Sequence, residues 1–209
     1  MKKLVITAIG LGSLATVSGA MAASTAMSTA IWQAEAKKNT TNELVVTPTR
    51  ALQFNYAAST KSFNQDTGTF DVAIRGDHSA ATGFKLEARV DDSNNTLRSL
   101  GDTSTVAVGA YWGGTELGSS KGGNGGVGKD ANWTTLVDSA QEIGSGSGLW
   151  ALTTSAGSPA DTELTARDNF KFQIVSATSD GSTATTFDKL PDGMWQGEVA
   201  VAFRATWSK

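Results

Sequence analysis

The sequence has no cysteine, which excludes disulfide frameworks, thiolate metal sites and cysteine nucleophiles. It has one histidine, His78, so a metal cage built from several histidines is excluded as well. Charged residues make up 18% of the 209 residues, below the roughly 25% typical of soluble domains. The formal net charge of −3 argues against a nucleic-acid partner, because nucleic acids are bound by basic surfaces. Proline is scarce, with 3 residues, whereas glycine is frequent, with 23.

The N-terminus has the pattern of an export signal. Lys2 and Lys3 precede an apolar run from Leu4 to Val17, and Ala20-Met21-Ala22 supplies the small–x–small pattern that signal peptidase cleaves. The run is shorter than the about 20 apolar residues that a membrane-spanning helix needs. We therefore expect residues 1–22 to be a signal peptide, cleaved between Ala22 and Ala23, and the mature chain to be exported.

Along most of the mature chain, apolar residues alternate with polar ones, which is the pattern of strands with one buried face. The apolar stripes are Leu52 to Tyr56, Phe70 to Ile74, Phe84 to Val90, Val106 to Trp112, Phe170 to Ile174 and a long final stripe from Trp195 through Val199, Val201 and Phe203 to Trp207. Turn-forming clusters such as Ser179-Asp180-Gly181 separate the stripes. Many short strands at this spacing predict an all-β, antiparallel sandwich.

The stretch from Gly113 to Gly148 is rich in glycine and serine, and we expect it to form mobile surface loops, with one short helix from Ala131 to Glu142. Within it, Gly123 to Gly128 followed by Lys129 has the spacing of a phosphate-binding loop. However, Asp130 stands where serine or threonine should hold magnesium. We interpret the motif as a glycine-rich loop without a nucleotide.

Candidate catalytic groups are few. Asp71 and Asp77 lie near His78, but Asp71 falls on the outward face of its predicted strand and residues 76–79 have the composition of a turn. We expect solvated turn residues there rather than an acid–base cluster. Because the sequence offers no credible pair of nucleophile and base, we predict that the protein is not an enzyme and has no cofactor.

The six tryptophans keep a second function open, because aromatic faces stack on sugar rings. Trp195 and Trp207 lie on the final apolar stripe and are expected in the core. Trp112, Trp133 and Trp150 border the glycine-rich loops, where any of them could be exposed. The alternative function is therefore a secreted carbohydrate-binding β-sandwich that closes its own fold.

Residues Ala23–Lys38 form a strand-like run without glycine or proline. The run could be the first strand of its own sandwich, or an extension that completes the sheet of a neighbour. The long apolar strand near the C-terminus needs a covering neighbour. If that neighbour is missing from the same chain, the fold leaves an open groove.

A set of short motifs also resembles a known family; the motifs include Ala30-Ile31-Trp32, Leu44-Val45-Val46-Thr47-Pro48, Phe70-Asp71-Val72-Ala73-Ile74, Asp168-Asn169-Phe170 and Ala205-Thr206-Trp207. They resemble the major pilins of the common pilus (ECP, or Mat, fimbriae), an alternate chaperone–usher system, and are more distantly similar to CFA/I-type pilins. Nearly the whole mature chain is covered, although residues 113–161 depart from the family pattern.

The resemblance implies an incomplete immunoglobulin-like β-sandwich, residues 39–209, that is completed by donor-strand exchange. The extension of residues 23–38 would fill the groove of the next subunit, with the donor residues Ala30, Ile31, Trp32, Ala34 and Ala36. The strand bordering the acceptor groove would carry Val199, Val201 and Phe203.

The resemblance further implies a structural major pilin that polymerises head to tail into an extracellular adhesive fimbria on the cell surface, supporting host-cell adhesion and biofilm. Its implied partners are other copies of itself, a periplasmic pilus chaperone, an outer-membrane usher, a tip adhesin and a receptor on the host-cell surface.

Overall fold

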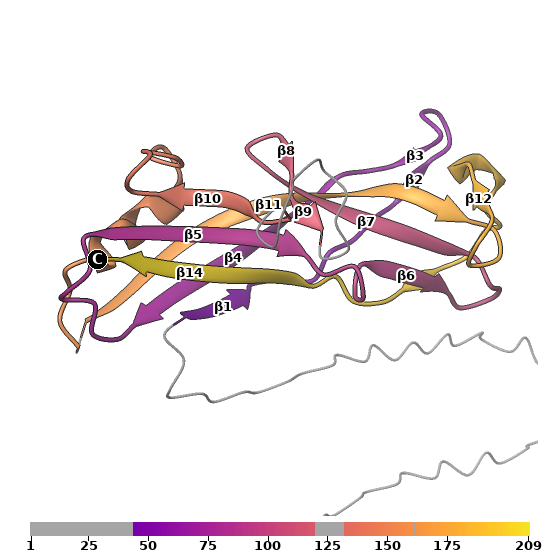
Figure 1. Ribbon diagram of the computed structural model, residues 1–209. Coiled ribbons are helices and arrows are strands. Elements are labelled where there is room, and N and C mark those ends of the chain that lie inside the picture. Colours follow the sequence, from indigo (N-terminus) through magenta and orange to yellow (C-terminus); the bar gives the residue numbers. More distant parts are fainter. Residues whose placement is uncertain (1–43, 120–131, 161) are drawn as a thin grey trace, which may run out of the picture. The chain divides into compact units, whose positions relative to one another are not determined.

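The computed structural model describes residues 44–119, 132–160 and 162–209, which form two packed β-sheets (Figure 1). The larger sheet runs in the order β1 (Leu44–Pro48), β4 (Asp66–Arg75), β11 (Glu163–Thr178), β7 (Thr105–Trp112), β6 (Thr96–Ser99) and β13 (Trp195–Gln196), with β12 (Ala184–Thr185) beside β11 and β8 (Thr115–Glu116) beside β7. The smaller sheet contains β10 (Thr134–Asp138), β5 (Gly83–Val90) and β14 (Val201–Ser208), with β9 (Gly118–Ser119) parallel to β5. A short ladder pairs β2 (Tyr56–Ala57) with β3 (Ser62–Phe63), and two 3₁₀ helices are η1 (Gly148–Ser155) and η2 (Phe187–Lys189).

The core lies between the two sheets and is built from the alternating stripes. The predicted inward faces of β4, β5, β7 and β11 are confirmed, because their alternate apolar residues are buried: Phe70, Val72, Ile74, Phe84, Leu86, Ala88, Val90, Val106, Val108, Ala110, Phe170, Phe172 and Ile174. The 3₁₀ helix η1 adds Leu149 and Leu152, both fully buried, which the sequence pattern did not predict.

The strand order is that of an immunoglobulin-like sandwich, which confirms the predicted all-β fold class. A constant-type immunoglobulin domain places strands A, B, E and D in one sheet and C, F and G in the other. Here β1-β4-β11-β7 follow the A-B-E-D order, and β5-β14 stand in the places of C and F. Among the described strands, none lies beside β14 in the place of G.

The final apolar stripe is not one strand, as its periodicity predicted, but two. β13 pairs with β6 in the larger sheet, whereas β14 pairs with β5 in the smaller sheet, so the chain crosses between the sheets within residues 197–200. Gly197 lies at this crossing, where a Cβ atom would stand only 2.8 Å from the Thr96 carbonyl oxygen. The close approach of two backbones breaks the ladder here, and hydrophobic periodicity does not report it.

The glycine-rich stretch is more regular than predicted. Thr134–Asp138 form β10, which pairs with β5, so the helix predicted for Ala131 to Glu142 is wrong. Leu136 and Val137 are fully buried in the core, and this burial explains why the segment joins the sheet despite its surroundings. The phosphate-loop motif at Gly123 to Lys129 lies outside the described residues.

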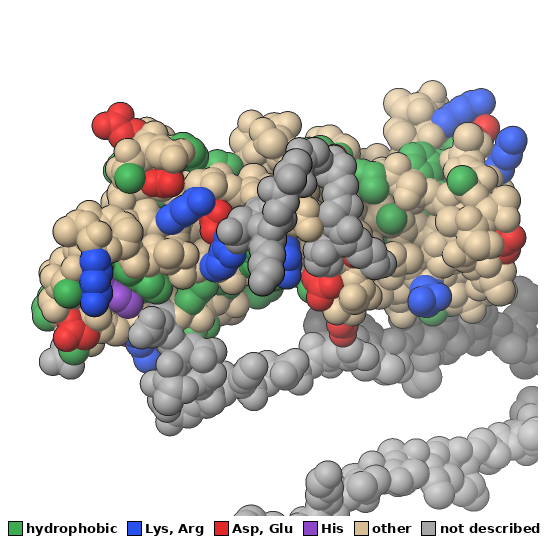
Figure 2. Space-filling model, viewed as in Figure 1, with side chains coloured by type: hydrophobic (Ala, Val, Ile, Leu, Met, Phe, Trp, Pro, Cys, Tyr) green, Lys and Arg blue, Asp and Glu red, His purple; other side chains and the backbone are tan. Residues whose placement is uncertain are grey.

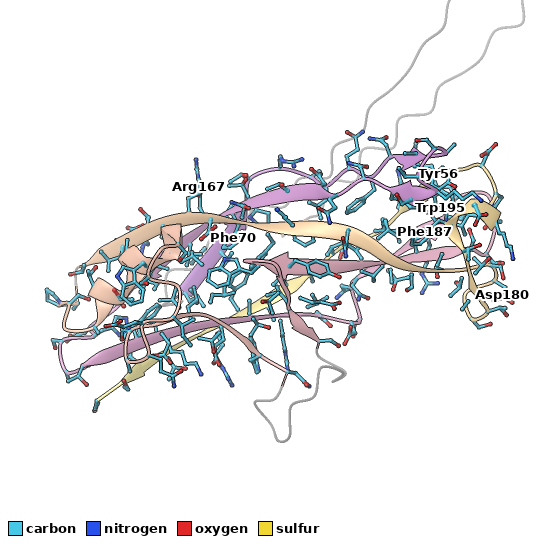
Figure 3. All side chains as sticks on the ribbon, turned by 90° about the horizontal axis from the view of Figure 1, so that it is seen from above. Tyr56, Phe70, Arg167, Asp180, Phe187 and Trp195 are labelled. Carbon is cyan, nitrogen blue, oxygen red and sulfur yellow. The ribbon has the colours of Figure 1, made fainter. Side chains whose placement is uncertain are left out.

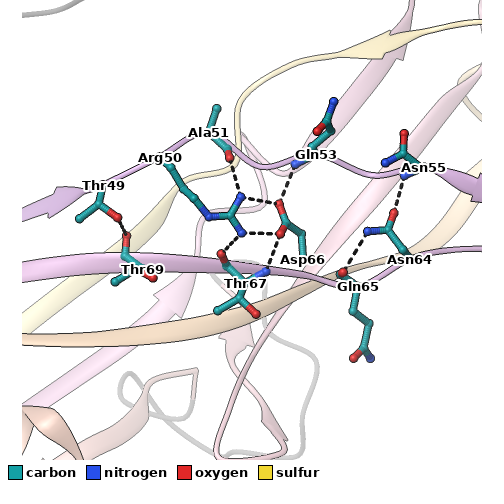
Figure 4. Close-up of polar contacts among 10 residues, drawn as sticks. All are labelled: Thr49, Arg50, Ala51, Gln53, Asn55, Asn64, Gln65, Asp66, Thr67 and Thr69. Carbon is teal, nitrogen blue, oxygen red and sulfur yellow. Dashed lines mark hydrogen bonds and ion pairs between the residues drawn. The ribbon is translucent and has the colours of Figure 1, made fainter.

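The segment after β1 is anchored to the start of β4 by polar contacts (Figure 4). Arg50 forms a bidentate ion pair with Asp66, and the backbone N–H of Gln53 donates to the same carboxylate at 2.8 Å. The hydrogen bonds from the Arg50 guanidinium hold the pKa of Asp66 below its ordinary value. Nearby, the N–H and the hydroxyl of Thr49 both donate to the Thr69 carbonyl, at 2.9 and 3.0 Å. These contacts fix the position of β1 at the edge of the sheet.

We expect Asp66→Asn to lower the free energy of unfolding at pH 7 by about 1 kcal/mol, because it removes a charged hydrogen-bonded pair whose arginine is half-exposed. Since folding lowers the pKa of Asp66, its contribution is present above pH about 4 and is lost as the pH falls through the lowered value. Urea unfolding should therefore show the two proteins converging from pH 5 to pH 2. A difference that persists at pH 2 would contradict this assignment.

Candidate functional site

The most distinctive feature of the described chain is the second edge of β14, along which no described strand pairs. The Thr82 N–H donates to the Ser208 carbonyl at 2.8 Å, and the Asp91 N–H donates to the Ala200 carbonyl at 2.9 Å. In an antiparallel ladder successive residues point their backbone groups to opposite sides. Even-numbered residues of β14 therefore bond to β5, whereas the N–H and C=O groups of Val201, Phe203, Ala205 and Trp207 point along the second edge.

The same four residues carry the apolar side chains of β14, and these face the core. Phe203 packs its ring 5.3 Å from Phe70 and 5.8 Å from Phe170, measured between ring centroids. Both partners are buried, yet all four side chains of β14 remain half-exposed. The apolar face of β14 thus covers the core and still lacks a neighbour on its second edge.

The strand β1 has a matching open edge in the other sheet. The bond from Thr49 to Thr69 fixes the phase of its ladder with β4, so that the backbone groups of Leu44 and Val46 point away from β4. Their side chains are half-buried against the core. Pro48, which has no N–H to donate, ends the strand at this edge, where a proline is tolerated.

The two open edges approach each other, because β1 and β14 are in contact. We name the surface that they frame the acceptor face; it consists of Leu44 and Val46 of β1, Val199 before β14, and Val201, Phe203 and Ala205 of β14. Apolar side chains line it, and on the β14 side it is bordered by backbone donors and acceptors that pair with no described strand. Such a surface can accept one extended segment of chain, which would add ladder bonds and cover the exposed apolar area.

A buried ionic cluster holds β14 in place from the outer side of the smaller sheet. Glu87 of β5 is almost fully buried; its carboxylate accepts from Arg204 Nε at 2.9 Å and lies 2.9 Å from Lys85 Nζ. The guanidinium groups of Arg89 and Arg204 lie over the ring of Trp133, at 4.4 and 4.7 Å from its centroid. Glu87 lies on the outward face of β5, and the cover by these side chains explains why it is not exposed.

The far end of the acceptor face is closed by an aromatic stack. His78 stacks on Trp207 with centroids 3.8 Å apart, and the Trp207 indole N–H donates to Ser155 Oγ at 2.9 Å. The prediction that His78 is a solvated turn residue is therefore wrong for its side chain, which is 7% exposed. Sequence periodicity could not find this contact, because residues 78, 155 and 207 are distant in the chain.

The other candidate groups are not brought together. Asp71 pairs with Arg167 on the outer face of the larger sheet, as predicted for its strand, whereas Asp77 accepts the N–H of Ser79 in an exposed turn. Across the described ranges, no group of three or more acidic or histidine side chains is placed to hold a metal ion. The same ranges contain no helix of the length and hydrophobicity needed to cross a membrane.

A separate cavity of about 560 Å³ lies where β7 and β11 meet the loop before η1. Of the tryptophans expected to border glycine-rich loops, Trp112 lines this cavity together with Tyr111, Asp168 and Lys171. Trp133 is covered by two arginines, as described above, and Trp150 is half-buried against the core. Trp195 and Trp207 pack against the core, but neither is fully buried.

Of the residues predicted to border an acceptor groove, Val201 and Phe203 lie in β14 and Val199 lies just before it, and all three pack against the core. The predicted donor residues Ala30, Ile31, Trp32, Ala34 and Ala36, and the predicted cleavage point at Ala22 and Ala23, lie outside the described residues. Sequence reasoning did not assign Leu44 and Val46 to the site. The segment Leu44-Val45-Val46 is apolar throughout, so no alternation in the sequence marks which of its residues face the core.

We expect Glu87→Gln to lower the free energy of unfolding by about 2 kcal/mol, because it removes the buried negative charge that Arg204 and Lys85 contact. Amide exchange in β14 should accelerate more than in β4, since the cluster joins β14 to β5. Arg75→Gln, which breaks the exposed pair with Glu163, is the matched control and should change stability by less than about 0.5 kcal/mol. Equal effects of the two variants would show that the cluster does not hold β14.

Comparisons with known proteins place these features in a family. Residues 25–207 match the fimbrillin MatB family. The chain is 43% identical, over the full length of both chains, to the common pilus major fimbrillin subunit EcpA of Klebsiella pneumoniae subsp. pneumoniae and to EcpA of Escherichia coli O1:K1 / APEC. It is also similar to the solved structure of the CooA pilin subunit from enterotoxigenic Escherichia coli, with 14% identity, a TM-score of 0.44, and coverage of 79% of this chain and 88% of that one.

Proposed function

Because the chain belongs to the MatB fimbrillin family, we propose that it is the major structural subunit of a fimbria on the cell surface, whose copies join by strand donation. The observation that carries the proposal is the acceptor face, where the place of strand G is empty among the described strands. In this proposal residues 23–38 of one copy fill that place in the next. No cofactor or catalytic group takes part.

The physical driving force has two parts. Burial of apolar surface contributes roughly 25 cal/mol per Å², and Val201, Phe203 and Leu44 offer half-exposed apolar side chains for it. An inserted strand also gives partners to the backbone groups along β14, which otherwise form an edge prone to aggregation. In an inserted strand, Ala30, Trp32, Ala34 and Ala36 would share one side and face the core of the acceptor, whereas Ile31 would lie on the opposite side.

Strand donation also explains the form of the product. A donor at one place and an acceptor at another make a contact that is head to tail and does not close, so the copies assemble into a fibre. No nucleotide is needed, since each step exchanges one strand for another in the same site. Before assembly an unfilled acceptor face requires protection, and this role falls to a periplasmic chaperone. An outer-membrane usher then exports the subunits, after removal of residues 1–22.

The proposed output is adhesion to host cells and support of biofilm by the fimbria, together with a tip adhesin and a host-cell receptor. The alternative of a self-contained carbohydrate-binding sandwich requires a closed fold. The open edges of β1 and β14 disfavour it, and so does the cover over Trp133. Size-exclusion chromatography separates the two, because the alternative requires a monodisperse mature monomer at high concentration.

We expect Trp32→Asp to block polymerisation while chaperone capture continues, because the chaperone uses the acceptor face and not the donor segment. Loss of a buried indole costs roughly 2 kcal/mol, equivalent to about a 30-fold fall in donor affinity, and a buried carboxylate adds to it. Electron microscopy of fibres sheared from cells gives the readout, with Trp32→Phe as the control. Fibres of normal length and number from the aspartate variant would exclude the donor role.

Moving residues 23–38 to the C-terminus, after Lys209 and a flexible linker, in a chain that starts at Asn39, should give a stable monomer. The appended segment then fills the acceptor face of its own chain, so the melting temperature should rise by at least 5 °C relative to the chain without it. The same addition carrying Trp32→Asp should raise it much less. An unchanged melting temperature would mean that the fold is already complete.

A further inference from the structure

Three exposed apolar side chains lie at the end of the sandwich that carries β6, β13 and the β2–β3 ladder. Leu100, Met194 and Tyr56 are 65%, 60% and 40% exposed, and they are three of the five large apolar residues exposed in the described chain. We name these three residues the end patch. Monomeric proteins expose single apolar residues commonly, but a contiguous group points to an interaction.

The three segments that carry the end patch are held together by a backbone hydrogen bond and an aromatic cluster. The Leu100 N–H donates to the Met194 carbonyl at 2.9 Å, and Met194 is followed by Trp195. The ring of Phe63 lies 6.1 Å from Trp195 and 5.4 Å from Tyr56, with edge contacts to both. Figure 3 shows Tyr56, Phe187 and Trp195 together at this end, and Figure 2 shows hydrophobic side chains at the surface near β12 and β3.

The direction of a donated strand determines which end of the acceptor meets the donating copy. β14 pairs antiparallel with β5, and antiparallel pairing is the more stable and the usual choice beside such a strand. An antiparallel donor therefore enters near Ser208 and leaves near Val201. Four residues, 197–200, separate Val201 from β13, in which Trp195 is opposite Ser99, the neighbour of Leu100. The donor leaves toward the end patch.

The linker between the donor segment and the sandwich of the same copy is short. Residues 39–43 separate the donor segment from Leu44, and five extended residues span at most about 17 Å. Leu44 lies opposite Ile74, next to the turn of residues 76–82. That turn and residues 157–158 are tied by backbone bonds between His78 and both Ser158 and Gly157. The turn carries one exposed carboxylate, Asp77, which accepts the N–H of Ser79. Beside it, Ala80, Pro159 and Ala160 are exposed, small and uncharged, and these three residues offer a surface to an apolar partner.

We propose that the end patch of one copy packs against the turn of residues 76–82 of the copy that donates its strand, so that the fibre has a second, pole-to-pole contact besides the inserted strand. The contact rests on strand donation as proposed above. It gives the end patch its cover and limits rotation about the connector of residues 39–43. The fibre is therefore stiffer than an inserted strand alone would make it.

The absence of native cysteine makes a sharp cross-linking test available. Met194→Cys and Ala80→Cys are introduced together in the full-length chain, and sheared fibres are treated with a short bismaleimide. Boiled samples should give a ladder of dimers, trimers and longer products, and either cysteine alone should give none beyond background. The control pair Asn169→Cys with Ala80→Cys, which uses an exposed position in the middle of β11, should also give no ladder.

The outcomes separate this contact from strand donation itself. Fibres that form but give no ladder with the Met194 pair, or an equal ladder with the control pair, overturn the contact and leave strand donation intact. Absence of fibres from the unsubstituted chain, with no binding of a peptide of residues 23–38, overturns both. As a second measurement, Leu100→Ser with Met194→Ser should reduce the persistence length of fibres at least twofold without changing peptide binding; unchanged stiffness contradicts the contact.

Discussion

Every part of the proposed assembly depends on one constraint, which is that the backbone groups of a strand need partners on both edges. In β14 the even-numbered residues meet this need through β5, while Val201, Phe203, Ala205 and Trp207 point theirs along an edge without a described neighbour. The same residues direct apolar side chains to the core. The backbone groups that need hydrogen-bond partners and the apolar side chains that need cover therefore lie along the same edge of β14. A single extended segment can satisfy both.

Contacts elsewhere in the sandwich hold β14 and β1 in position for the strand that the proposal inserts beside them. On one side, the buried Glu87 cluster holds β14 against β5 from the outer face. On the other side, the Arg50–Asp66 pair fixes the segment that follows β1. At one end, Trp207 is stacked on His78 and bonded to Ser155. Each strand of the acceptor face is thus fixed by contacts that an inserted strand does not use, so the site does not have to form anew during assembly.

Much of this fold could be predicted from period-two alternation, because β4, β5, β7 and β11 each bury alternate residues and each present a regular stripe. The predictions failed where the chain left this regular pattern. Because the segment around β10 is rich in glycine, loops and a short helix were predicted there instead of a strand. β10 joins the sheet through two buried residues, Leu136 and Val137. The close backbone approach at Gly197 divided the last stripe between two sheets. His78 was placed in solvent because its partner, Trp207, is remote in sequence.

For the site, the family resemblance predicts Val199, Val201 and Phe203 as acceptor residues, and this stays a prediction. It did not identify Leu44 and Val46, because a stripe of two residues carries little signal on its own. The exposed residues Leu100, Met194 and Tyr56 belong to three separate segments, and only the folded arrangement brings them to one end. Local pattern therefore indicates strands and their faces, whereas open edges and end surfaces follow from strand order.

Residue-resolved amide exchange in β14 tests the incomplete edge most directly. In an isolated subunit beginning at Asn39, the amides of Val201, Phe203, Ala205 and Trp207 should exchange at least 100-fold faster than those of Ala202, Arg204 and Thr206, which bond to β5. In assembled fibres both sets should exchange slowly. If the odd-numbered amides are already as well protected in the isolated subunit as the even-numbered ones, β14 has a neighbour within its own chain, and the incomplete sandwich is contradicted.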